Sequence, residues 1–124
     1  MRLNEEKHSN AVICALKGIV NSIKTEKNVK IDLLFAIVVI IAGIVFKISL
    51  LEWIICTILI GLVISAEIMN TAIEAVVDLV TRERHPLAGK AKDAAAGAVL
   101  ILAIISAIIG SIIFIPKLID LIKK

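Results

Sequence analysis

The chain has 124 residues, of which 60% are hydrophobic, and its mean hydropathy is +1.03. A soluble domain of this length buries only part of its surface, so the excess of apolar residues indicates a protein surrounded by lipid. The composition excludes a disordered chain, and the net charge of +3 is too small and too scattered to suggest nucleic-acid binding. Cys14 and Cys56 fit neither a zinc pattern nor a disulfide framework, and we interpret them as small apolar residues.

The N-terminal part of the chain predicts an amphipathic helix on the membrane surface, over about residues 9–25. Polar side chains such as Lys17 and Lys24 fall on one face of this helix. Apolar side chains recur at helical spacing on the other face: Val12, Leu16, Ile19, Val20 and Ile23. A helix that packs on the protein itself is an equally good interpretation, and the two are compatible.

Three runs without charged residues, at 33–46, 53–66 and 94–116, predict membrane spans. A helix needs about 20 apolar residues to cross a bilayer, and only the third run reaches that length unaided. The first run can extend toward the lysines that flank it. The second can cross only if it continues past Glu67, which places a polar group in or near the hydrocarbon. We therefore expect one domain over residues 1–124, with spans at about 29–47, 50–80 and 87–116.

The links between the spans carry helix-start signals and set the orientation. Ser49 and Glu52 match a capping box, and Pro86 can open the third spanning helix at its first position. Residues 1–30 hold six Lys and Arg, the second link holds four and the first link holds one. Because positive charge stays in the cytoplasm, we expect a multi-pass protein of the cell (inner) membrane, with the N-terminus and the second link cytoplasmic.

A stripe of polar residues marks the cytoplasmic end of the second span. At about 100° per residue, Glu67, Asn70, Glu74 and Asp78 fall within an arc of roughly 80° on one helix face. An ionisable residue at the membrane centre costs about 2.5–3.5 kcal/mol on insertion, so such residues indicate function by default. Polar packing between helices is the structural alternative, but three carboxylates on one face are better explained by a cation among them.

Further polar residues lie on the same side of the membrane. Glu26 precedes the first span, and Lys92 and Asp93 open the third. Carboxylates for a divalent cation, a lysine for phosphate and a buried carboxylate as base are the parts that phosphoryl transfer needs. The sequence has no P-loop motif, so a nucleotide site would be of another design. A small ion carrier or a structural subunit is the alternative class, although a carrier needs acidic groups across the full membrane depth.

Residues 67–78, EIMNTAIEAVVD, followed by residues 85–97, HPLAGKAKDAAAG, resemble the prokaryotic diacylglycerol kinase and undecaprenol kinase family. The resemblance implies an all-α integral membrane homotrimer, each subunit with an amphipathic surface helix and three transmembrane helices. It also implies transfer of the γ-phosphate of ATP to a lipid alcohol with Mg²⁺. The sequence looks more like Gram-positive members, which are typically undecaprenol kinases, and diacylglycerol is the alternative substrate.

The same resemblance implies roles for individual residues. Glu67 would be the general base toward the lipid hydroxyl, and Asn70 would orient Glu67 or a phosphate. Glu26 and Glu74 would hold the metal ion, and Lys92 would pair with phosphate oxygens. Asp78 and Asp93 would hold the site together or meet the nucleotide. The remaining residues expected to border the nucleotide are Lys17, His85, Gly89 and Lys90.

Overall fold

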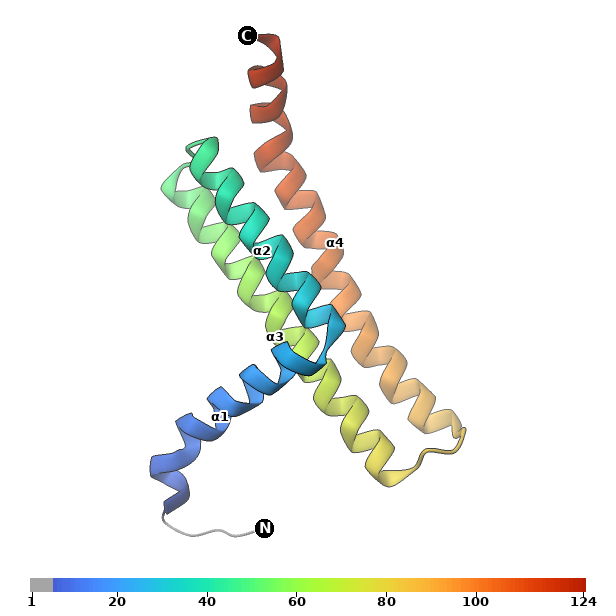
Figure 1. Cartoon of the computed structure of the whole chain (residues 1–124). Helices are drawn as coiled ribbons and strands as arrows, with labels where there is room; N and C mark the ends of the chain where they lie inside the picture. Colours follow the sequence, from blue (N-terminus) through green and yellow to red (C-terminus); the bar gives the residue numbers. More distant parts are fainter. Residues whose placement is uncertain (1–5) are drawn as a thin grey trace.

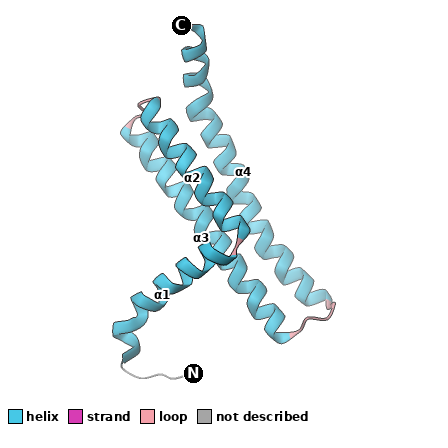
Figure 2. Ribbon diagram, in the orientation of Figure 1, coloured by secondary structure: helices cyan, strands magenta, loops and turns pink. Residues whose placement is uncertain are grey.

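The structure, a computed structural model, describes residues 6–124, with side chains from Asn10 onward, and consists of four α-helices without strands over that range. They are α1 (Glu6–Thr25), α2 (Lys27–Val45), α3 (Leu50–Val80) and α4 (Pro86–Lys123). Helix α3 packs against both α2 and α4, while α1 leaves this bundle at the start of α2 (Figures 1 and 2). The predicted all-α architecture is confirmed.

Helices α2, α3 and α4 are each long and apolar enough to cross a membrane. Many of their apolar side chains face outward: Phe35 on α2 is 65% exposed and Ile112 on α4 is 67% exposed. Exposed apolar surface costs about 25 cal/mol per Å² in water but not in lipid. The described part of the chain therefore has the predicted arrangement of three membrane-spanning helices and a separate N-terminal helix.

The link between α2 and α3 closes one end of the bundle with the predicted capping box. Glu52 accepts a hydrogen bond from the Ser49 backbone N–H at 2.9 Å, and the Ser49 hydroxyl accepts one from the Glu52 N–H at 3.1 Å. The second oxygen of Glu52 contacts Lys117 Nζ at 3.0 Å, which ties the start of α3 to the last third of α4. Ile48, Cys56 and Ile113 are buried in a small apolar core. Helix α4 continues through Pro116 to Lys123.

Gly43 on α2 allows the Trp53 ring to approach the helix backbone at this end. A Cβ atom on Gly43 would lie 2.6 Å from Trp53 Cη2. We expect Gly43→Ala to destabilise the protein by about 1–3 kcal/mol, because extra volume in a packed site forces its neighbours to move. Thermal unfolding in detergent measures this effect. Gly61→Ala is the matched control, since a Cβ there meets nothing within 4 Å; equal melting temperatures for the two variants would contradict the prediction.

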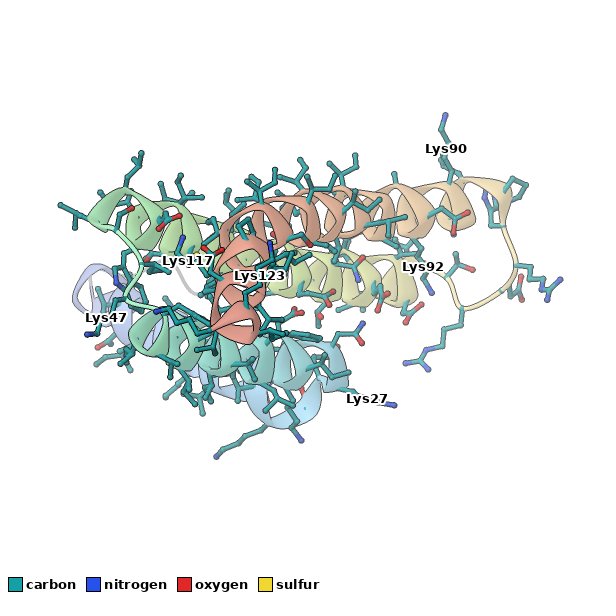
Figure 3. All side chains as sticks on the ribbon, turned by 90° about the horizontal axis from the view of Figure 1, so that it is seen from above. Lys27, Lys47, Lys90, Lys92, Lys117 and Lys123 are labelled. Atoms are coloured by element: carbon teal, nitrogen blue, oxygen red, sulfur yellow. The ribbon has the colours of Figure 1, made fainter. Side chains whose placement is uncertain are left out.

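At the other end of the bundle the helices extend to different distances, and this brings polar residues together. The last turns of α3 and the first turns of α4 extend beyond the start of α2, where α1 and α2 meet (Figure 1). The polar stripe of α3 therefore runs past the N-terminus of α2 toward the α3–α4 link. Figure 3 shows Lys27, Lys90 and Lys92 toward this end, and Lys47 and Lys117 toward the opposite one.

Candidate active site

Glu26 lies at the break between α1 and α2, and the break directs its carboxyl toward α3. As the N-cap residue of α2 it has an extended backbone, with φ −103° and ψ 118°. The Thr71 hydroxyl on α3 lies 3.1 Å from Glu26 Oε1 and 3.1 Å from the backbone carbonyl of Glu67. A hydroxyl has one hydrogen to donate, so Thr71 serves one of these acceptors at a time. This contact couples the α1–α2 break to the polar stripe.

A polar pocket of about 180 Å³ forms where the start of α2 meets α3. Glu67 is the deepest acidic residue in it, with only 7% of its surface exposed, whereas Glu74 is exposed. The structure thus brings together four of the predicted site residues from two helices. The pocket is lined by Glu26, Lys27, Asn28, Glu67, Asn70, Thr71 and Glu74.

Asn70 contacts a carboxylate that was predicted to bind metal. Its Nδ2 donates to Glu74 Oε1 at 3.4 Å, and its Oδ1 is buried without a hydrogen-bond partner. The Asn70 N–H therefore orients Glu74, while Asn70 Oδ1 can accept a hydrogen bond from a group that enters the pocket. In a buried site an unpaired acceptor is costly, so a ligand that donates to it would gain affinity.

The pocket offers two carboxylates, Glu26 and Glu74, to a divalent cation. Within the described residues, no group of three or more His, Cys, Asp or Glu comes together as a metal site. Mg²⁺ keeps several of its waters and usually binds through one or two carboxylates together with substrate phosphates. Two carboxylates beside an open polar pocket fit that requirement.

Lys92 joins the start of α4 to the end of α3. Its Nζ lies 2.7 Å from Asp78 Oδ1, and the two side chains are 40% and 41% exposed. Figure 3 shows Lys92 on the side of α4 that faces α3, whereas Lys90 points away from the bundle. An exposed pair of this kind contributes about 0–1 kcal/mol, so the lysine can exchange Asp78 for another anion at little cost.

A second cavity, of about 580 Å³, lies at the α3–α4 link beside this ion pair. The His85 side chain caps α4, because its Nδ1 accepts a hydrogen bond from the Leu87 N–H at 3.1 Å. The cavity is therefore framed by a helix start and by basic side chains, which suits an anion. Its lining includes four charged residues together with the capping histidine and a glycine: Arg82, Glu83, Arg84, Lys92, His85 and Gly89.

Three predicted site residues lie apart from these hollows. Lys17 lines a separate groove on α1 together with Leu16, Val20 and Lys24. Lys90 and Asp93 are exposed on the first turns of α4. The structure thus gathers the other predicted residues into a polar pocket, an ion pair and a link cavity.

Two residues near the polar pocket received no role from the sequence. Thr71 lies four residues after Glu67, so the helical period alone places it beside the stripe. Asp32 is an isolated acidic residue in the spanning part of α2, and its Oδ2 is buried without a hydrogen-bond partner. An acidic residue within an apolar span was the available signal for Asp32.

Comparison with known proteins identifies the family. The model of the family described as prokaryotic diacylglycerol kinase matches residues 13–114. The chain belongs to this family. It is 50% identical over 102 residues to the undecaprenol kinase of Bacillus subtilis (strain 168), which covers 82% of this chain and 83% of that protein. The predicted resemblance is confirmed.

Two other relatives are named diacylglycerol kinases. The diacylglycerol kinase of Synechocystis sp. is 36% identical over 108 residues, which is 86% of this chain and 62% of the relative. The diacylglycerol kinase of Escherichia coli (strain K12) is 53% identical over 47 residues, or 38% of each protein. All three relatives are named kinases, which confirms the predicted enzyme class and leaves the carrier and structural-subunit alternatives without support.

Proposed function

We propose that this family member transfers the γ-phosphate of ATP to the hydroxyl group of undecaprenol, with Mg²⁺, and yields undecaprenyl phosphate. The observation that carries the proposal is the 50% identity to an undecaprenol kinase over 82% of the chain. Similarity to the named diacylglycerol kinases is lower over a comparable length, or confined to a shorter segment. Phosphorylation of diacylglycerol to phosphatidic acid is the alternative reaction.

Glu67 is the general base in this proposal. It is the most buried carboxylate of the polar stripe and lines the polar pocket on α3. Its carboxylate takes the proton of the lipid hydroxyl while the alcohol oxygen attacks the γ-phosphorus and ADP departs. A positioned base of this kind contributes about 10²–10⁴-fold to the rate.

Glu26 and Glu74 hold the metal ion in the proposal. They come from different elements, the α1–α2 break and α3, and Thr71 and Asn70 respectively orient them by hydrogen bonds. Bound there, Mg²⁺ would neutralise negative charge on the ATP phosphates as the phosphoryl group leaves. Lys92 exchanges Asp78 for a phosphate oxygen, which its half-exposed ion pair permits.

The nucleotide occupies the link cavity next to this lysine. His85 and Gly89 form part of its wall. In this proposal Lys90 and Asp93, which lie outside the cavity on the first turns of α4, would meet the part of the nucleotide that extends beyond it. Lys17 lies on α1, apart from this cavity. It would contact the nucleotide only in an assembly that brings α1 to the cavity. Homotrimers in the cell (inner) membrane, with the N-terminus and the site on the cytoplasmic side, complete the proposal. The four basic residues in and beside the α3–α4 link support this orientation: Arg82, Arg84, Lys90 and Lys92.

Thr71→Val tests the role of the hydrogen bond to Glu26. Removal of the hydroxyl frees the Glu26 carboxyl, and the loss of such an outer partner typically costs about 10–100-fold in metal affinity. We therefore expect the Mg²⁺ concentration at half-maximal activity to rise by about that factor. Thr71→Ser keeps the hydroxyl and serves as the control. Equal Mg²⁺ dependence of the two variants would show that this hydrogen bond does not serve the metal site.

A competition experiment tests the substrate assignment. The purified protein receives γ-labelled ATP and Mg²⁺ in vesicles that contain undecaprenol and diacylglycerol at equal mole fractions. We expect the label to enter undecaprenol faster. Faster labelling of diacylglycerol would support the kinase reaction but show that diacylglycerol, not undecaprenol, is the preferred substrate.

A further inference from the structure

Residues 117–124, here termed the terminal segment, have no role in the proposed function. The match to the family model covers residues 13–114, so the terminal segment lies beyond it. It continues helix α4, which ends at Lys123. From residue 118 onward every side chain of the segment is exposed, and no helix of the described chain covers it. Its large apolar side chains are Leu118, Ile119, Leu121 and Ile122, the last of which is 73% exposed.

The α2–α3 link marks the level at which the terminal segment leaves the membrane core. Helix α2 ends just before this link, and its 19 residues extend over about 28 Å, close to the hydrocarbon thickness of about 30 Å. Glu52, next to the link, holds Lys117 Nζ at 3.0 Å, so the segment starts at this boundary. Figure 1 shows the last turns of α4 beyond the link. Aliphatic side chains that faced water there would be unfavourable.

The terminal segment separates its apolar and charged side chains onto two faces. At about 100° per residue, the four apolar side chains fall within an arc of roughly 160°, and the charged ones occupy an arc of about 120° opposite them. Three of the four charged side chains are basic: Lys117, Asp120, Lys123 and Lys124. Helices with an aliphatic face and a basic polar face lie in the plane of the membrane interface.

Pro116 lies inside α4 at the start of the terminal segment and allows the helix to bend there. Proline has no N–H to donate to the carbonyl of Ile112, and helices kink at such positions. The segment extends over about 12 Å, whereas the headgroup layer on each side of a bilayer is about 5–8 Å thick. An upright segment would therefore pass through this layer into water. A segment that lies flat keeps its apolar face against the acyl chains.

We propose that the terminal segment is an interfacial anchor: it bends at Pro116 and lies along the membrane surface on the side of the α2–α3 link. Its apolar face contacts the acyl chains, and Lys123 and Lys124 extend toward the headgroup phosphates. The partner of this surface is thus the bilayer itself, and the anchor fixes the depth of the end of α4. The inference goes beyond the proposed function and does not depend on kinase activity.

Spin labels at single cysteines test the orientation of the terminal segment. The full-length protein, with Cys14→Ser and Cys56→Ala, receives one new cysteine at a time from residue 118 to residue 124. It is placed in vesicles of phosphatidylcholine and phosphatidylglycerol. Collisions of each label with a water-soluble paramagnetic reagent and with oxygen, which concentrates among acyl chains, are then measured. Ile112→Cys, on an exposed apolar position of the span, and Glu83→Cys, in the exposed α3–α4 link, give the lipid and water references.

We expect both collision rates to vary along the terminal segment with a period of about 3.6 residues and with opposite phase. Labels at Leu118→Cys and Ile122→Cys should resemble the lipid reference, and labels at Asp120→Cys and Lys124→Cys the water reference. Values near the water reference at all four positions would show an upright segment in water and overturn the inference. Labels at Leu118→Cys and Ile122→Cys that meet neither reagent would show that a second copy covers the apolar face, which would also overturn it.

Discussion

Glu67→Gln is expected to lower kcat for lipid phosphorylation by about 10²–10⁴-fold and to leave KM for ATP within about twofold. Glutamine has the size of glutamate and retains hydrogen-bonding groups, so the 7% exposed site stays packed. It has no carboxylate to take a proton from the alcohol. Initial rates at several ATP concentrations, in vesicles with saturating lipid, separate kcat from KM.

The role of Glu67 is decided by whether Glu67→Gln changes kcat or KM. An interaction made only in the transition state lowers kcat and kcat/KM together, whereas uniform binding raises KM alone. Asp120→Asn controls for the loss of an acidic residue elsewhere in the chain. A raised KM with unchanged kcat would show that Glu67 binds a substrate and that the base lies elsewhere.

Glu26→Gln and Glu74→Gln are each expected to raise the Mg²⁺ concentration needed for half-maximal activity by at least about 10–100-fold. That factor is typical of the loss of a partner that only orients a metal ligand, so the loss of a ligand should cost no less. Each substitution removes one negative charge from the acidic lining of the pocket, to which Glu26 and Glu74 both contribute. Activity measured over a Mg²⁺ titration at fixed ATP gives the value for each variant.

A gain in activity at high Mg²⁺ distinguishes a metal ligand from a residue needed for folding. We expect both variants to recover part of their kcat as the Mg²⁺ concentration rises, and the double variant to recover less. Asp120→Asn, at an exposed position near the end of α4, is the matched control for charge. If Glu26→Gln or Glu74→Gln has the same half-saturating Mg²⁺ concentration as the wild type, the substituted residue is not a metal ligand.

Local sequence signals predicted the elements of the fold because those signals act over a few residues. The Ser49–Glu52 capping box and Pro86 at the first position of α4 depend only on neighbouring backbone groups, and the structure confirms both. The short apolar run before Glu67 predicted that α3 continues through its polar stripe, because a span needs about 20 residues. Helix α3 indeed runs from Leu50 to Val80.

The helical periodicity of the sequence does not predict which residues of different helices are in contact. The helical period places Glu67 and Thr71 on one face of α3, but it does not give the register of α2 against that face. The Thr71–Glu26 contact depends on this register and on the break at Glu26. The assignment of Lys17 to the nucleotide came from resemblance alone, and in the structure Lys17 lines its own groove on α1.

Transfer of the γ-phosphate to undecaprenol by the purified protein is the most direct test of the central claim. The protein is placed in vesicles with undecaprenol, γ-labelled ATP and Mg²⁺, and the lipid and ADP are quantified together. We predict that labelled undecaprenyl phosphate forms in a one-to-one ratio with ADP and that chelation of Mg²⁺ stops the reaction. ADP release without labelled lipid, or no reaction with undecaprenol at any Mg²⁺ concentration, would contradict the claim.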